Sequence, residues 1–208
     1  MKITITAATI RAAAIAAAAK DIRYYLVGVH ISIAHQEYAT VYGTDGHILF
    51  AGRARYKSLT EVPMQSIAIT VPLDIVKKCD KRAAVFVLES LTEGAYMLDG
   101  MRFTPLDGRY PDVQRVITRR DQIQPVAPAF VDPDLQVRGQ TALALHFGDK
   151  KGTLYPMLQQ GTSAALIHNG TNDAVCVVMP MRKDGAEYQG FQFDLPAPLA
   201  AAPHLKIA

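Results

Sequence analysis

Cysteine is scarce in this sequence of 208 residues, which contains only Cys79 and Cys176. The two lie far apart, form no CxxC pair and have no histidine cluster at metal-ligand spacing beside them. The sequence therefore predicts no metal site. We expect both thiols to be reduced and buried in a cytoplasmic protein that needs no cofactor.

Long apolar runs and a strong charge of one sign are also missing. No segment approaches the ~20 apolar residues that span a membrane. The alanine-rich stretch at 12–19 follows Arg11 and a region where Ile3 and Ile5 alternate with polar residues, which favours a strand over a signal peptide. The net charge of +3 permits contact with nucleic acid but does not require it.

Catalytic signatures are absent as well. The sequence has no nucleophile elbow, Walker loop or dinucleotide fingerprint. An enzyme would have to build acid–base pairs from His30, His47, Asp45 and Asp112. Lone histidines are more often structural, so we expect a protein without catalytic activity.

Half of the residues are hydrophobic, which allows one large domain or two small ones. A strand at 3–6 precedes an alanine-rich helix at about 10–20, which either Thr6 or Thr9 can cap. Alternating apolar residues predict strands at 23–33 and 38–42, and Asp45-Gly46 predicts a hairpin to a further strand. Residues 1–56 thus form a predicted βαβββ unit.

The same order then begins again. A strand at 67–71, a helix starting at Pro72 and strands at 84–88, 95–98 and 101–104 make a second βαβββ unit over 66–108. A third, less regular unit follows, with a strand at 127–131, a helix from Asp132 that Gly139 weakens, and strands near 154–158, 164–168 and 175–179. Residues 184–208 lack periodicity and are expected to form a flexible tail.

Four short motifs resemble the bacterial DNA polymerase III β sliding clamp, in that family's order. They are Arg23-Tyr-Tyr-Leu-Val-Gly28, Thr44-Asp-Gly-His47, Asp107-Gly-Arg-Tyr-Pro-Asp112 with Arg115-Val116, and Val177-Val-Met-Pro-Met-Arg182. The resemblance implies an α+β DNA-clamp fold with one complete clamp domain at 1–118 and about half of a second at 119–183. The family's first domain has no counterpart in these residues.

In the family, a hydrophobic cleft between the middle and last domains receives short linear motifs of polymerases, the clamp loader and repair proteins. Apolar pockets with a few polar groups suit such peptides, and methionine adapts to different partners. Carried over by motif, the peptide-binding residues are Arg23, Leu26, Thr44, Gly46, His47, Leu49, Pro111, Arg115, Val116, Val177, Val178, Met179, Pro180, Met181 and Arg182.

Contact with double-stranded DNA is the second expectation. The resemblance gives this role to Lys20, Tyr24 and Tyr25, and basic residues on inner helices add phosphate attraction, for which the candidates are Arg11, Lys77, Lys78, Lys81 and Arg82. The family tends to carry a basic pair where this sequence has Leu73-Asp74, which weakens the expectation.

The family closes its ring between first and last domains, so the usual dimeric ring is not expected. A homo-oligomer remains the prediction, and four chains of three units would make a twelve-unit ring. Three functions stay open: a minimal clamp that tethers polymerase to DNA, a peptide-binding decoy or adaptor that modulates a full-length clamp, and a structural relic.

The tail contains a further motif, Gln192-Phe193-Asp194-Leu195-Pro196. It resembles the clamp-binding pattern of glutamine followed by apolar, small or acidic, and leucine positions. We hypothesise that it docks into a clamp cleft, in the same chain, a neighbour or a full-length clamp.

Overall fold

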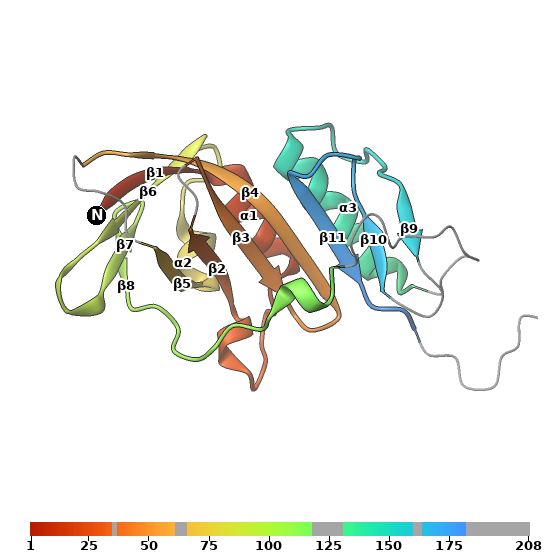
Figure 1. The fold of residues 1–208 in the computed structure, drawn as a ribbon, viewed down its shortest axis with the longest axis horizontal. Helices are drawn as coiled ribbons and strands as arrows, with labels where there is room; N and C mark the ends of the chain where they lie inside the picture. Colours follow the sequence, from red (N-terminus) through yellow and green to blue (C-terminus); the bar gives the residue numbers. More distant parts are fainter. Residues whose placement is uncertain (35–36, 61–65, 118–130, 160–163, 182–208) are drawn as a thin grey trace, which may run out of the picture.

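The fold is seen in a computed structural model that describes residues 1–34, 37–60, 66–117, 131–159 and 164–181 (Figure 1). The helices are α1 (Ala7–Ala16), α2 (Leu73–Lys78) and α3 (Pro133–Phe147), with 3-10 turns at Tyr24–Leu26, Thr92–Gly94 and Val113–Arg115. The strands are β1 (Lys2–Thr6), β2 (Gly28–Ile33), β3 (Tyr38–Thr44), β4 (Ile48–Ser58), β5 (Ile67–Pro72), β6 (Val85–Ser90), β7 (Tyr96–Leu98), β8 (Met101–Phe103), β9 (Met157–Gln159), β10 (Ala165–Ile167) and β11 (Ala174–Val178).

The first two units have the predicted βαβββ order and pair with each other through their first strands. β1 pairs with β4 of its own unit and with β6 of the second, while β5 pairs with β2 of the first. Ile3 and Ile5 on β1 are fully buried, as their alternation predicts. These pairings join the two units through backbone hydrogen bonds as well as a shared core.

Strand β4 connects this pair of units to the third one. Its first residues, from Ile48 to Gly52, pair with β11, and its last ones pair with β1, while β3 runs along its other edge. β11 continues to β10 and β9, so the sheet crosses from the first unit into the third without a break (Figure 1).

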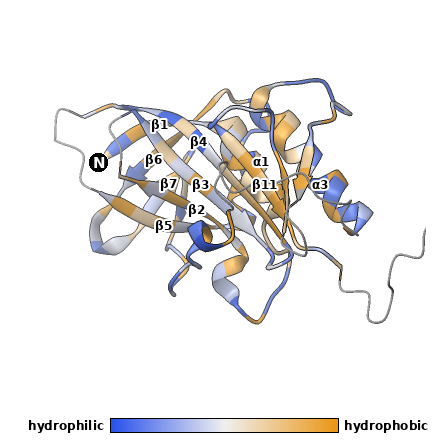
Figure 2. Ribbon diagram, turned by 45° about the vertical axis from the view of Figure 1, so that its right-hand side comes forward, coloured by the Kyte–Doolittle hydropathy of each residue, from blue (hydrophilic) through white to orange (hydrophobic). Residues whose placement is uncertain are grey.

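The helices cover one face of the strands. α1 packs between α2 and α3 and against β3 and β4, and α3 packs on β11. Figure 2 shows hydrophobic residues concentrated where α1, β4 and β11 meet. Phe50 of β4 and Cys176 of β11 are cross-strand partners on this face and have no exposed surface. Both cysteines are buried and unpaired, as predicted.

The predicted bounds differ most from the structure at two elements, the first helix and the second strand. The first helix covers 7–16 rather than 10–20, and Thr6 makes no capping bond with its side chain. The helix ends because Ala17 turns extended and Ala18 donates its N–H to the Leu26 carbonyl. The strand predicted to start at Arg23 begins at Gly28, since Tyr24–Leu26 forms a 3-10 turn that buries Leu26.

The third unit contains the predicted helix and three strands. Asp132 caps α3 by accepting from the Asp134 N–H at 2.8 Å. Gly139 is buried inside α3, where an added Cβ would lie 2.9 Å from the Ile167 Cδ1 atom. The glycine that weakens this helix therefore permits its close approach to β10 and β11. Of the strand predicted at 127–131, only Val131 is described, and it makes an isolated bridge with Pro180.

Candidate functional site

A second, smaller apolar cluster lies on the face of the sheet opposite the helices. Its buried members are Leu49 of β4, Val177 of β11, Leu166 of β10 and Val113, and we call it the outer cluster. Leu49 pairs directly with Val177, which pairs with Leu166. Because neighbouring residues on a strand point to opposite faces, these side chains face away from the helices that cover Phe50 and Cys176.

The chain segment 110–117 covers part of this face. Val113 is 7% exposed in its 3-10 turn, and Tyr110 and Ile117 pack against the outer cluster. The Tyr110 ring stacks on His30 with 4.5 Å between centroids and 13° between planes. Burial lowers the pKa of His30 to about 4 and raises the pKa of Tyr110. The stack fixes the start of the covering segment to β2.

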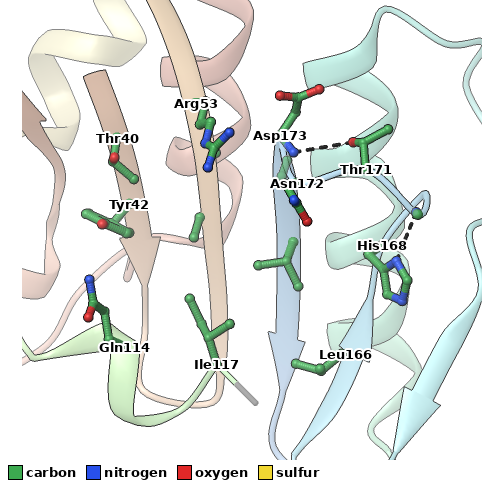
Figure 3. A pocket seen from close by; sticks show the side chains of 15 residues that line it. Thr40, Tyr42, Arg53, Gln114, Ile117, Leu166, His168, Thr171, Asn172 and Asp173 are labelled. Atoms are coloured by element: carbon green, nitrogen blue, oxygen red, sulfur yellow. Dashed lines mark hydrogen bonds between the residues drawn. The ribbon is translucent and has the colours of Figure 1, made fainter. Parts of the chain in front are cut away.

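A pocket of about 380 Å³ opens beside the outer cluster (Figure 3). Figure 3 shows Tyr42, Gln114 and Ile117 on one side of it and Leu166 on the other. Tyr42, Ile117, Leu166 and Val175 belong both to its lining and to the outer cluster or the residues packed on it. The remaining lining residues are Thr40, Ala51, Gly52, Arg53, His168, Gly170, Thr171, Asn172, Asp173 and Ala174.

The predicted peptide-binding residues divide by burial. Five of them are buried: Leu26, Thr44, Leu49, Val177 and Val178. Thr44 pairs with Leu49 across β3 and β4, so it shares the outer face, and its hydroxyl donates to the Ile48 carbonyl at 2.7 Å. Val178 is packed in the main core and faces the helices, away from any ligand on the outer cluster.

Three apolar residues of the predicted set are accessible at the rim of the outer face. Val116, Met179 and Met181 are 44%, 49% and 57% exposed. Pro111 and Arg115 are also exposed, and Arg115 pairs with Asp112 at 3.1 Å. Pro180 is partly buried. Arg182 and the tail residues Gln192, Phe193, Asp194 and Leu195 lie outside the described residues.

The turn between β3 and β4 holds the other predicted residues, Gly46 and His47, together with Asp45. Gly46 has a φ of 94°, which glycine adopts without strain. The Asp45 carboxylate accepts from the N–H groups of His47 and Ile48 at 2.8 and 3.0 Å. The His47 carbonyl in turn accepts from Met179 N–H at 2.8 Å, which brings the turn and the end of β11 together.

Arg23 lies beside this turn and forms an ion pair with Asp21. Its guanidinium makes two bonds to Asp21, at 2.8 and 3.0 Å, and a longer one to the Asp45 carbonyl at 3.4 Å. The hydrogen bonds from Arg23 lower the pKa of Asp21 to about 2. Arg23 is thus held at the helix side of the turn.

The predicted DNA-binding residues are only partly brought together. Lys20 and Lys77 line a groove of about 660 Å³ with Arg23 and Arg138, which we call the helix-side groove. Its other lining residues are Ala14, Ile15, Ala17, Ala18, Ala19, Asp21, Asp45, His47 and Leu73. Four Lys or Arg against two Asp leave it with two excess positive charges.

The other predicted DNA contacts lie apart from that lining. Arg11 donates to the carbonyls of Asp80 and Ala83, and Lys78 pairs with Asp74 at 3.2 Å. Both cations are therefore engaged within the protein. The remaining four candidates are accessible or partly so: Tyr24, Tyr25, Lys81 and Arg82.

The described residues contain no group of three or more His, Cys, Asp or Glu that could hold a metal ion. In the same part of the chain, no helix is long and apolar enough to cross a membrane. Three of the four residues weighed for acid–base chemistry make contacts within the protein: His30 stacks on Tyr110, Asp45 binds the turn amides, and Asp112 pairs with Arg115.

Sequence reasoning missed seven residues that complete the outer face: Tyr42, Tyr110, Val113, Ile117, Ala164, Leu166 and Val175. Strand alternation could have indicated two of them, because Tyr42 lies two positions before Thr44 and Val175 two before Val177. No local signal marks Val113 or Leu166, which reach this face through chain segments far apart in sequence.

The fold has known counterparts among solved structures, in the family that the four sequence motifs resemble. No family model matches the chain, and no curated protein matches its sequence. Sliding clamps from Pseudomonas aeruginosa and Bacillus subtilis superpose with TM-scores of 0.59 and 0.57 at 17% and 14% identity. The Caulobacter crescentus pol III β structure gives 0.55 at 15%.

These matches cover 88% of this chain and 67%, 64% and 66% of the three clamps respectively. The chain thus spans about two thirds of the length of the clamps it matches. At such low identity the likeness establishes the fold alone. The chain has the fold of the bacterial DNA polymerase III β sliding clamp.

Proposed function

We propose that this is a sliding-clamp-like replication protein that binds short linear motifs of polymerases, clamp loaders or repair proteins in a groove on the outer face of its sheet. One observation carries the proposal: the outer cluster and its adjoining pocket lie where β4 meets β11, between the first and third units. The groove comprises the outer cluster, the pocket and the accessible rim of Val116, Met179 and Met181.

The physical properties of this surface suit a peptide. An apolar anchor side chain of a partner fits a pocket of about 380 Å³ that has Leu166 and Val175 in its lining. The two half-exposed methionines can adapt their side chains to different anchors at small cost. The exposed rim arginine Arg115 supplies direction. Binding of this kind requires no catalytic group, and we propose that the protein is not an enzyme.

A titration with a fluorescent peptide carrying glutamine, an apolar residue, a small or acidic residue and leucine tests the groove. Replacing Met179 and Met181 together by alanine should weaken binding about tenfold, since each loses a buried thioether contact in the complex. Leu59→Ala is the matched control, because Leu59 is equally exposed at 49% but lies at the far end of β4. Equal affinity of the double variant and the wild type would refute the groove.

DNA contact is the second part of the proposal. The helix-side groove, with Lys20 and Lys77, would attract phosphates without reading sequence. We further propose that residues 1–118 form a complete clamp-like domain, that 119–183 form part of a second, and that several chains assemble into a ring. Retention on nicked circular DNA, with loss on linearisation, together with light scattering, tests that assembly. A monomer under all conditions would contradict it.

A further inference from the structure

Arg138 of α3 contacts two other elements at once. Its Nε and Nη2 atoms donate to the Ile15 carbonyl at 3.3 and 2.9 Å, and its Nη1 donates to Asp45 Oδ2 at 2.7 Å. Ile15 lies in the last turn of α1, where backbone carbonyls lack partners within the helix. One guanidinium thus joins α3, the end of α1 and the turn between β3 and β4.

The Asp45 carboxylate links Arg138 to the backbone of the turn. While one carboxylate oxygen binds Arg138, the other accepts from the N–H groups of His47 and Ile48. Burial alone would raise the pKa of Asp45, but the bonds from these amides and from Arg138 hold it below its usual value. The carboxylate therefore stays charged at neutral pH and keeps all three bonds.

The backbone of the turn is in turn bonded to the proposed peptide groove. The His47 carbonyl accepts the Met179 N–H, and Met179 belongs to the accessible rim. A chain of hydrogen bonds runs from Arg138 through Asp45 and His47 to Met179. The Arg138 and Asp45 side chains are 34% and 18% exposed, so solvent screens this pair less than the exposed pairs of the molecule.

We propose that Arg138 is a positioning residue for peptide binding: through Asp45 it sets the β3–β4 turn and the start of the Met179–Met181 rim on the opposite side of the sheet. The proposal rests on the proposed function for its consequence, but its structural part stands by itself. Arg138 belongs to the third unit, whereas its partners Ile15 and Asp45 belong to the first. The turn therefore has its binding conformation only when the third unit is docked on the first.

The test compares Arg138→Gln, Arg138→Lys, Asp45→Asn and the double variant Arg138→Gln/Asp45→Asn. Arg138→Gln and Asp45→Asn should each weaken peptide affinity about tenfold, as expected for a lost hydrogen bond between charged groups. Arg138→Lys keeps the charge and should recover part of the loss. The double variant should bind no more weakly than the poorer single variant, because both changes break the same contact. Lys2→Gln, which removes the distant 3.1 Å pair with Glu89, should leave affinity unchanged.

Amide hydrogen exchange provides the readout that a general loss of stability would not give. The amides of His47, Ile48 and Met179 should exchange about tenfold faster in Arg138→Gln and Asp45→Asn, while core amides such as Ile31 and Leu88 keep their protection. If Arg138→Gln fails to fold, Asp45→Asn decides, since it preserves the bonds from Arg138 to Ile15.

The outcomes separate the two proposals. If the wild type binds no peptide, the proposed function fails, and the exchange rates alone decide on Arg138. Unchanged exchange at the three amides would overturn the positioning role. So would wild-type peptide affinity in both single variants.

Discussion

Leu49 of β4 and Val177 of β11 are direct cross-strand partners, both less than 5% exposed on the face of the sheet opposite the helices. Their pairing joins the first unit to the third. It also creates the surface on which the proposed function depends, because neither unit alone would present both side chains. Stability and binding should therefore be linked at this junction.

Truncating Leu49 should measure that link. Leu49→Ala removes buried methyl groups from the outer cluster and should lower the free energy of unfolding by about 2–4 kcal/mol. Chemical denaturation followed by circular dichroism gives the value. Leu59→Ala, at a half-exposed position, should change it by less than about 0.5 kcal/mol. Equal effects of the two substitutions would mean that Leu49 is not buried as described.

Gly43 of β3 should be intolerant of any side chain. A Cβ there would lie 1.9 Å from the Ala13 carbonyl oxygen of α1, and a backbone atom cannot move away without displacing the helix. Gly43→Ala should cost about 3 kcal/mol or more. Gly139→Ala is the matched control. Its added methyl would lie under 3 Å only from the end of the Ile167 side chain, which can shift more easily than backbone, and alanine favours the helix by about 1 kcal/mol. Thermal denaturation should therefore show a much smaller loss.

Acid should destabilise the protein through His30. Burial lowers the pKa of His30 to about 4 in the folded protein, against 6.5 in the unfolded chain. Between these two pH values the unfolded chain binds the proton and the folded protein does not. The contribution of neutral His30 to the free energy of unfolding is therefore fully present above pH 6.5 and is lost as the pH drops towards 4. The loss should be on the order of 2 kcal/mol, less than the full shift because the ring is partly accessible.

His30→Phe tests this assignment, because phenylalanine keeps the stack on Tyr110 but does not titrate. Urea unfolding at several pH values should give a flatter profile for the variant over pH 4–6.5. His146, whose pKa burial also lowers, keeps the profile from becoming level. A variant profile parallel to that of the wild type would exclude His30 as a source of acid sensitivity.

DNA binding should depend on the helix-side groove. Replacing Lys20 and Lys77 together by glutamine should weaken binding of a short duplex and reduce the slope of log affinity against log salt by about 2, near 0.9 per lost phosphate contact. Lys57→Gln with Lys151→Gln removes the same charge from exposed positions outside the groove and should leave the slope unchanged. Fluorescence anisotropy at several salt concentrations measures both.

Much of the fold follows from local patterns. Ile3 and Ile5 alternate as a strand must, and the predicted strands at 95–98 and 101–104 are joined by Asp99-Gly100, a tight turn with positive φ at both residues. The end of the first helix did not follow from local patterns, because the alanine run contains no stop signal. The helix ends where the Ala18 N–H bonds to the Leu26 carbonyl. Long-range contacts decided that boundary.

Residues of the candidate site could be predicted only where they belong to one of the four motifs. Thr44, Gly46, His47 and Met179 do come together around one turn. Arg138 could not be predicted, since its partners Ile15 and Asp45 are distant in sequence and meet only when α3 docks. Val178 was included by motif although strand alternation turns it towards the helices.

The most direct test of the central claim is a nuclear magnetic resonance titration of the isotopically labelled protein with a clamp-binding peptide. The proposed groove predicts chemical-shift changes at the amides of Leu49, Leu166 and Val177 and in segment 110–117, with α1 and α2 unchanged. Changes confined to the helices, or none at millimolar peptide, would contradict a peptide groove on the outer face of this sheet.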